Sequence, residues 1–164
     1  VLLVHASGND GKDLEPGTGN RNFPSAFLND GAQAPVWLEI GASADDLTAL
    51  AAPFSNYGQT RVDLFAPGAQ VTSLAPGGGI QTADGTSFAS PVVAGVAALV
   101  LTYFPDLTAE QLRAIIVDSA TRYAGAESGR PGDGELVRFG TLSVTGGVVN
   151  AAEAVRLAME RTGS

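Results

Sequence analysis

The residues with the clearest chemical potential in this sequence place a serine at the start of an apolar helix. Residues 85–91 read Gly-Thr-Ser-Phe-Ala-Ser-Pro and join a polar, glycine-rich stretch to an apolar run that ends near Tyr103. The first backbone N–H groups of a helix lack intrahelical partners, and the helix dipole favours negative charge there. An oxyanion formed by attack of Ser87 on a carbonyl group would therefore be stabilised at this position. The alternative is that Ser87 serves only as the helix N-cap.

The elements that must position this serine can be predicted from hydrophobic patterning. Three apolar runs predict buried strands at residues 1–6, 37–42 and 62–65, and residues 71–74 and 80–82 predict a hairpin around a Pro-Gly-Gly-Gly turn. The polar segment 12–34 is expected to be a surface loop. Continuously apolar strands separated by long connections indicate an α/β fold with a mainly parallel sheet flanked by helices.

Three helices are predicted. The run 87–103 is apolar nearly all round, which predicts a central helix that is covered on every face. Residues 108–111 read Thr-Ala-Glu-Gln, a capping box for a second helix, and residues 150–153 read Asn-Ala-Ala-Glu and open a third. No linker divides the sequence, so we expect one structural unit.

Composition excludes several classes of function. The 164 residues, 45% of them hydrophobic and 16% charged, indicate a globular chain of ordinary domain size. The net charge of −8 argues against nucleic acid as a partner. The absence of cysteine excludes disulfides and thiol catalysis. The apolar run 88–104 is short for a membrane span and interrupted by Ser, Pro, Gly and Thr, so a core helix is favoured.

The sequence resembles a known family, the subtilisin-like serine proteases or subtilases. Residues 85–91 match the family's nucleophile motif, Gly-Thr-Ser-x-Ala-Ser-Pro, at all six specified positions. Four further segments are similar to the family and occur in the same order, at residues 5–11, 54–58, 63–68 and 146–151. The resemblance implies a subtilisin-like fold and a serine endopeptidase that forms an acyl-enzyme on Ser87. It also implies that Asn9 donates to the oxyanion; the alternative is a turn asparagine without a catalytic part.

The resemblance leaves the catalytic base unaccounted for. A serine hydroxyl needs a histidine to take its proton and a carboxylate to orient that histidine. The sole histidine, His5, falls where the family has the wall of the substrate cleft, and the His-Gly-Thr and Asp-Ser/Thr-Gly motifs occur nowhere in this sequence. In subtilases the Asp and the His come before the Ser, and both would precede Val1. We therefore expect residues 1–164 to be the C-terminal portion of a protease domain, inactive or nearly so alone.

The resemblance also implies a structural calcium ion, although no cofactor is required for the chemistry. The ligands would be Asp63 and the carbonyl groups of Pro35 and Trp37, completed by water because calcium takes six to eight oxygens. The alternative for Asp63 is a solvated loop carboxylate.

The family further implies polypeptide substrates and a secreted, periplasmic or cell-envelope location in a bacterium, without nucleic acid or membrane as partners. A truncated domain would expose a sheet edge and a helix face, so we expect self-association or binding to the complementary N-terminal segment. A non-catalytic pseudo-protease that binds peptides, or a structural fragment, remains the alternative. An esterase is disfavoured because no Gly-x-Ser-x-Gly elbow is present and no histidine follows Ser87.

Overall fold

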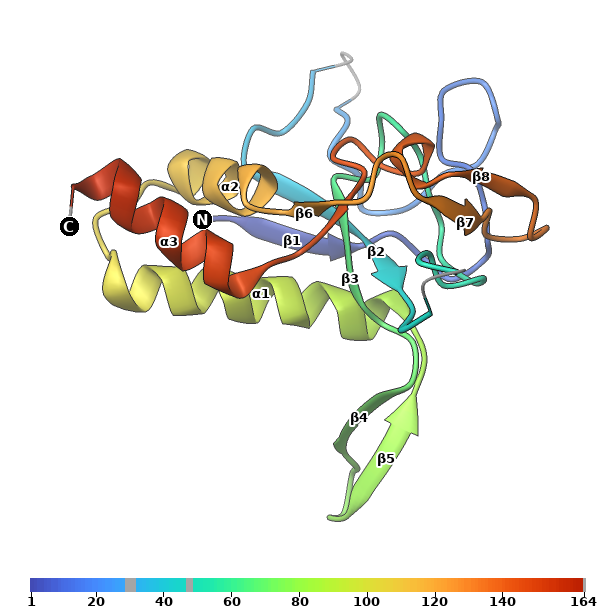
Figure 1. Cartoon of the computed structure of the whole chain (residues 1–164), viewed down its shortest axis with the longest axis horizontal. Coiled ribbons are helices and arrows are strands. Elements are labelled where there is room, and N and C mark those ends of the chain that lie inside the picture. The colour runs from blue at the N-terminus through green and yellow to red at the C-terminus, as the bar shows by residue number, and fades with distance from the viewer. Residues whose placement is uncertain (29–31, 47–48, 164) are drawn as a thin grey trace.

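A five-stranded sheet runs through the computed structural model, which describes residues 1–28, 32–46 and 49–163 (Figure 1). The strand order is β1-β2-β3-β9-β6, where the strands are β1 (Leu3–Ala6), β2 (Trp37–Ser43), β3 (Leu64–Pro67), β9 (Gly147–Val148) and β6 (Thr121–Arg122). β1, β2, β3 and β9 pair in parallel, and β6 is antiparallel to β9. The predicted α/β fold with a mainly parallel sheet is confirmed.

Helix α1 (Thr86–Tyr103) lies along one face of this sheet and contacts β1, β2 and β3 (Figure 1). Successive side chains of a strand point to opposite faces, and Leu38, Ile40 and Ala42 of β2 accordingly join the α1 side of the core. The α1 residues in this core are Ala89, Val93, Val96, Ala97 and Val100. This packing fixes the helix axis against the sheet and sets where the helix begins.

Helices α2 (Ala109–Asp118) and α3 (Ala151–Thr162) contact α1 and complete the same core. The predicted capping box of α2 is confirmed: the Gln111 N–H donates to Thr108 Oγ1 over 3.2 Å, and the Thr108 N–H donates to Gln111 Oε1 over 2.8 Å. At the start of α3, the Glu153 N–H donates to Asn150 Oδ1 over 3.0 Å. Side-chain caps therefore define where both helices begin.

The opposite face of the sheet is covered by loops and a short hairpin, β7 (Glu127–Gly129) with β8 (Leu136–Arg138), followed by the 3-10 turn η1 (Phe139–Thr141). Phe65 and Phe139 are fully buried there, with ring centroids 5.0 Å apart. A Cβ on Gly41 would lie 2.5 Å from the Phe65 ring, so a glycine in β2 is what lets the ring lie across the strand. In its described part, the predicted loop 12–34 contains turns and isolated bridges but no helix or strand.

The outer face of α1 differs from the sequence prediction. The helix was expected to be covered all round, but Leu99, Leu101 and Tyr103 are 36–68% exposed, and Ala94 and Ala98 are exposed beside them. By length and composition α1 could cross a membrane, yet its buried face packs on the sheet as a core helix. The described residues cover one face of α1 and leave the other open.

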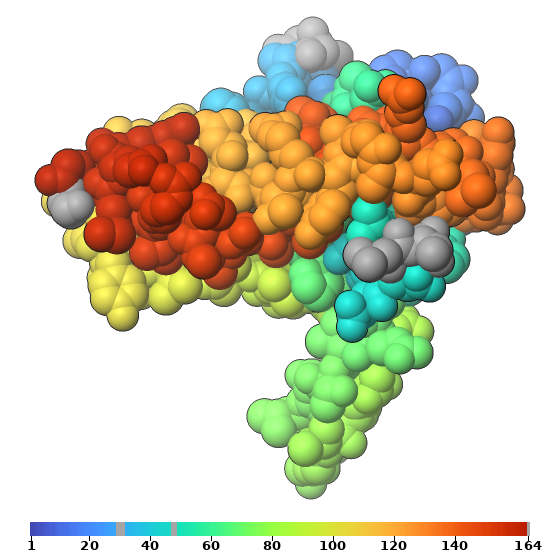
Figure 2. Space-filling view, viewed as in Figure 1, coloured from blue at the N-terminus to red at the C-terminus, as the bar shows by residue number. Residues whose placement is uncertain are grey.

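The predicted hairpin of β4 (Val71–Leu74) and β5 (Ile80–Ala83) is confirmed and projects from the body of the molecule (Figure 2). Leu74 and Ile80 pair near its tip and are 82% and 74% exposed. The hairpin leads directly into α1, so it stands next to the predicted nucleophile.

Candidate active site

Ser87 lies at the edge of the sheet where the parallel strands end. β1, β2 and β3 all finish on this side, and α1 begins there. Ligands of open parallel sheets bind outside the carboxyl ends of the strands, where the connecting loops meet. The loop after β1 and the Ala-Pro-Gly segment 66–68 at the end of β3 are the parts of the chain that meet the start of α1.

Ser87 is exposed and is the second residue of α1. The N-cap is Gly85, which makes no side-chain capping bond, so the interpretation of Ser87 as a mere N-cap is wrong. Gly85 is held by its N–H, which donates to the Gly68 carbonyl over 2.8 Å. The Ser87 hydroxyl is therefore presented to solvent at a helix N-terminus, beside N–H groups that have no intrahelical partner.

Asn9 is brought to the same helix start by Thr86. Its Oδ1 accepts hydrogen bonds from the Thr86 N–H and the Thr86 hydroxyl, each over 2.8 Å. Thr86 Oγ1 in turn accepts the Gly8 N–H over 3.1 Å. Because the amide oxygen faces Thr86, the Asn9 NH2 group is directed away from Thr86, and it makes no hydrogen bond within the described part of the chain.

Both of these groups lie close to Gly85 at the start of α1. A Cβ placed on Gly85 would lie 2.9 Å from Ser87 Oγ and 3.5 Å from Asn9 Nδ2. The residue also has φ 155° and ψ 150°, a backbone conformation that is essentially restricted to glycine. The glycine therefore allows a nucleophile and a hydrogen-bond donor to lie close to the same backbone position.

Asn56 holds the loop that carries Asn9, and the sequence analysis missed this role. Its side chain is buried; Oδ1 accepts the N–H groups of Asp10 and Lys12 over 3.1 and 2.9 Å, and Nδ2 donates to the Ser7 carbonyl over 2.8 Å. The Asn56 N–H also donates to the Gly8 carbonyl over 2.8 Å. The motif 54–58 was noted only as family-like, because these partners lie more than forty residues away.

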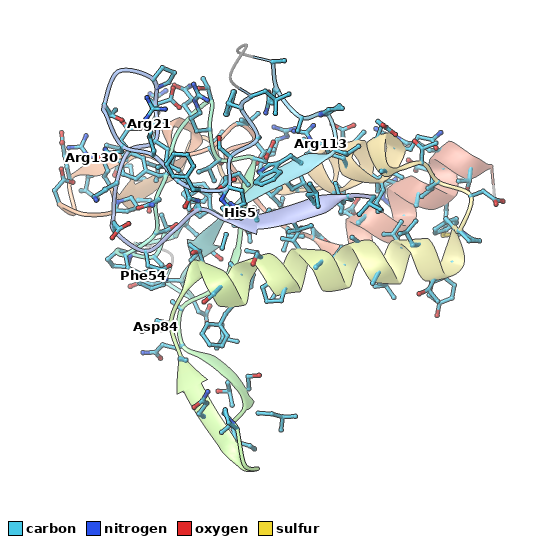
Figure 3. All side chains as sticks on the ribbon, turned by 180° about the vertical axis from the view of Figure 1, so that it is seen from behind. His5, Arg21, Phe54, Asp84, Arg113 and Arg130 are labelled. Atoms are coloured by element: carbon cyan, nitrogen blue, oxygen red, sulfur yellow. The ribbon has the colours of Figure 1, made fainter. Side chains whose placement is uncertain are left out.

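His5 is engaged away from the helix start. Its Nδ1 lies 3.0 and 3.1 Å from the two carboxylate oxygens of Glu39, and its ring stacks at a tilt on Trp37, with the ring centroids 5.1 Å apart. Figure 3 shows His5 on the side of β1 away from α1, whereas Asp84 lies where the hairpin joins the helix. Within the described part of the chain, His5 makes no hydrogen bond to Ser87.

A pocket of about 490 Å³ lies beside the loop that follows Asn9. Its lining includes parts of the segment 14–28 together with Glu39 and Arg61, and the Arg61 guanidinium stacks 3.5 Å above the Phe27 ring. Ser87 and Asn9 do not line it. The two predicted site residues are therefore not part of this pocket.

Two of the three predicted calcium ligands are hydrogen-bonded to Arg113. Arg113 donates from Nε to the Trp37 carbonyl over 2.7 Å and from Nη2 to Asp63 Oδ1 over 2.6 Å. Pro35 is exposed in the turn before β2. Burial raises the pKa of the Asp63 carboxyl, and the Glu39 N–H and the Arg113 guanidinium offset this rise only in part. A guanidinium therefore lies in contact with two of the three predicted ligands.

A comparison with known proteins shows which family this chain is similar to. Residues 1–140 match the subtilase family. The chain belongs to the subtilase family. Among its relatives, alkaline elastase YaB from Bacillus sp. (strain YaB) is 36% identical over 156 residues, and subtilisin-like protease 1 from Trichophyton verrucosum is 38% identical over 101 residues. These alignments cover 95% and 62% of the subtilase chain.

Solved structures confirm the subtilisin-like fold. A structure of the subtilase cytotoxin SubAB assembly matches with a TM-score of 0.76 and 26% identity, covering 98% of this chain and 49% of that one. The self-cleaved protease domain of PatA matches with a TM-score of 0.68 and 27% identity, covering 98% and 51%. The subtilase chain thus spans about half of these domains, and 33% and 22% of the two curated relatives.

Gly85 should tolerate no side chain, in contrast to a second glycine of the same helix. Gly85→Ala places a methyl group 2.9 Å from Ser87 Oγ and strains the backbone, so we expect a loss of about 1–3 kcal/mol in the free energy of unfolding. Gly95→Ala is the matched control, because nothing lies within 4 Å of its Cβ position and alanine favours a helix by about 0.5–1 kcal/mol. Urea unfolding monitored by circular dichroism measures both. Equal effects of the same sign would contradict this account.

Asn56→Ala should loosen the loop that carries Asn9. The substitution leaves two N–H groups and one carbonyl without their partner, so we expect a loss of about 2–4 kcal/mol in the free energy of unfolding. Asn150→Ala is the control, since it removes one helix cap and costs about 1 kcal/mol. Midpoints of urea unfolding compare the two, and an Asn56 variant no less stable than the Asn150 variant would argue against the clamp.

Proposed function

We propose that residues 1–164 are the C-terminal portion of a subtilisin-like serine endopeptidase domain and carry its nucleophile, Ser87, and an oxyanion donor, Asn9. The observation that carries the proposal is that Ser87 Oγ and Asn9 Nδ2 both lie close to Gly85, 2.9 and 3.5 Å from the position that a Cβ there would take. Family membership supports serine protease chemistry in general.

In the proposed reaction, Ser87 Oγ attacks the carbonyl carbon of a peptide bond as its proton passes to a histidine base. The carbonyl oxygen becomes an oxyanion, which accepts hydrogen bonds from the Ser87 N–H and Asn9 Nδ2. Collapse of this intermediate breaks the C–N bond, and the leaving amine takes the proton from the base. Water then hydrolyses the acyl-enzyme on Ser87.

The base and its orienting carboxylate would come from a segment outside residues 1–164. His5 is held by Glu39 and Trp37 on the side of β1 away from α1, so it is not proposed as the base. It follows that the isolated chain is inactive or nearly so. Peptide binding without turnover, even with the full domain, is the outcome that would favour a pseudo-protease.

Hydrolysis of a fluorogenic peptide ester tests the mechanism. We expect no Ser87-dependent turnover by the isolated chain, and turnover by a protease domain that also includes the Asp and His motifs. In that domain Ser87→Ala should abolish turnover, and Asn9→Ala should lower kcat by about 10²–10³-fold, the loss known for one such donor in a subtilisin. Ser90→Ala, a nearby serine of the same motif, is the control. Full activity of Asn9→Ala would overturn its role.

We also propose that the open face of α1 and the free edge of β1 bind the complementary N-terminal segment of the same domain. The face includes Leu99, Leu101 and Tyr103, and β1 pairs only with β2 among the described strands. The support for this occupant is that the chain covers about half of the two solved structures named above.

Light scattering after size-exclusion chromatography tests this surface. We expect the isolated chain to self-associate, because exposed apolar patches and sheet edges recruit partners. Addition of the N-terminal segment should convert it to a complex with one copy of each. Leu101→Lys should weaken both associations, whereas Glu110→Lys on the exposed side of α2 should leave them unchanged. A stable monomer that does not bind the N-terminal segment would contradict the proposal.

The parent protein is proposed to be exported, to the medium, periplasm or cell envelope of a bacterium. The support is family resemblance, together with a relative from Bacillus and a chain without cysteine. Export would place the peptidase among polypeptide substrates outside the cytoplasm.

A further inference from the structure

Arg113 joins three elements that are far apart in the sequence. It lies in α2, and its guanidinium reaches the carbonyl of Trp37, the first residue of β2, and the carboxylate of Asp63, which precedes β3. The two bonds measure 2.7 and 2.6 Å and span 76 and 50 residues of sequence. A single side chain therefore ties the helix to two neighbouring strands (Figure 3).

Asp63 needs a cation at this position. The residue is only 5% exposed, and a buried carboxylate is costly unless it is paired and hydrogen-bonded. Its Oδ2 accepts the Glu39 N–H over 2.7 Å, and its carbonyl accepts the Thr145 N–H and hydroxyl over 3.1 and 2.9 Å. Oδ1 is the oxygen left for a positive partner.

We propose that the Arg113 guanidinium supplies the positive charge beside the Asp63 carboxylate and takes the place of a divalent metal ion. The three groups that the family resemblance predicts as calcium ligands include the two that Arg113 binds. Guanidinium is planar and always charged, so one edge can serve a carbonyl oxygen and a carboxylate oxygen together. A calcium ion would need six to eight oxygens and would lie against a like charge. The described residues contain no group of three His, Cys, Asp or Glu side chains that could hold a metal ion.

The position is connected to the loop that carries Asn9. Glu39, whose N–H binds Asp63, directs a buried carboxylate to the other side, where it accepts Trp37 Nε1 and Asn22 Nδ2 over 2.8 Å each. Asn22 Nδ2 also donates to the carbonyl of Ala6, the last residue of β1, over 2.8 Å. The ion pair thus supports the base of the loop without needing an ion from solution.

Calcium dependence of the melting temperature, measured on residues 1–164, tests the proposal without reference to catalysis. We expect the same Tm in EDTA and in millimolar CaCl2. Arg113→Ala should lower Tm by about 10 °C in EDTA, because it leaves Asp63 buried and unpaired, and calcium should restore part of the loss. Arg122→Ala is the matched control: it removes a guanidinium that donates to the Thr145 carbonyl over 3.0 Å, and it should show no calcium response.

Terbium luminescence gives a local readout. Terbium(III) prefers oxygen ligands, as calcium does, and emits when a nearby tryptophan is excited; Trp37 is the single tryptophan of the chain. We expect no sensitised emission above background from the unaltered chain. Emission should appear in Arg113→Ala and disappear again in Arg113→Ala/Asp63→Asn.

Three results would overturn the proposal. The first is a calcium-dependent rise in Tm of the unaltered chain that Asp63→Asn abolishes. The second is an Arg113→Ala variant as stable as the unaltered chain. The third is an unstable Arg113→Ala variant that responds to neither calcium nor terbium, which would leave an ordinary ion pair. If Arg113→Ala does not fold, Arg113→Lys replaces it, because lysine keeps the charge but loses the planar pair of donors. The comparison of Tm in EDTA and in CaCl2 on the unaltered chain also still tests the proposal.

Discussion

Two hydrogen bonds from Thr86 to Asn9 Oδ1 determine what the candidate site can do. They join the first residue of α1 to the loop after β1, across 77 residues of sequence, and both measure 2.8 Å. An amide has an acceptor end and a donor end, so occupying the oxygen directs the NH2 group away from Thr86, with Nδ2 3.5 Å from the position that a Cβ on Gly85 would take. Without this constraint Asn9 would be an exposed loop residue with no fixed orientation.

Near this site, buried polar residues hold the loops in place, which hydrophobic packing alone cannot do. Loops carry backbone groups that no strand or helix satisfies, and every such group must find a partner when it is buried. Asn56 provides hydrogen-bond partners for the loop around Asn9. Asp63 accepts hydrogen bonds from β2 and from Thr145, through its side chain and its carbonyl group respectively. The apolar core places α1 against the sheet, while these side chains set the shape of the loops at its end.

Prediction from the sequence succeeded where the structure is determined by neighbouring residues. The capping box at Thr108, the cap at Asn150 and the hairpin around the Pro-Gly turn depend on residues within a few positions of each other, and all three are confirmed. It was wrong about the outer face of α1, because hydrophobic patterning reports what a helix is able to bury and not what is present to bury it. It also missed Asn56 and Arg113, whose partners are 44 or more residues distant.

The sequence by itself determined the α/β class, the position of Ser87 at a helix start and membership of a protease family, because motifs and periodicity are properties of neighbouring residues. Only the tertiary structure decided which way the Asn9 amide faces and that Ser87 and Asn9 both lie beside Gly85. Only it placed Arg113 against Asp63 and the Trp37 carbonyl. These features depend on distances between segments far apart in the chain, which are set when helix and strands pack together and not before.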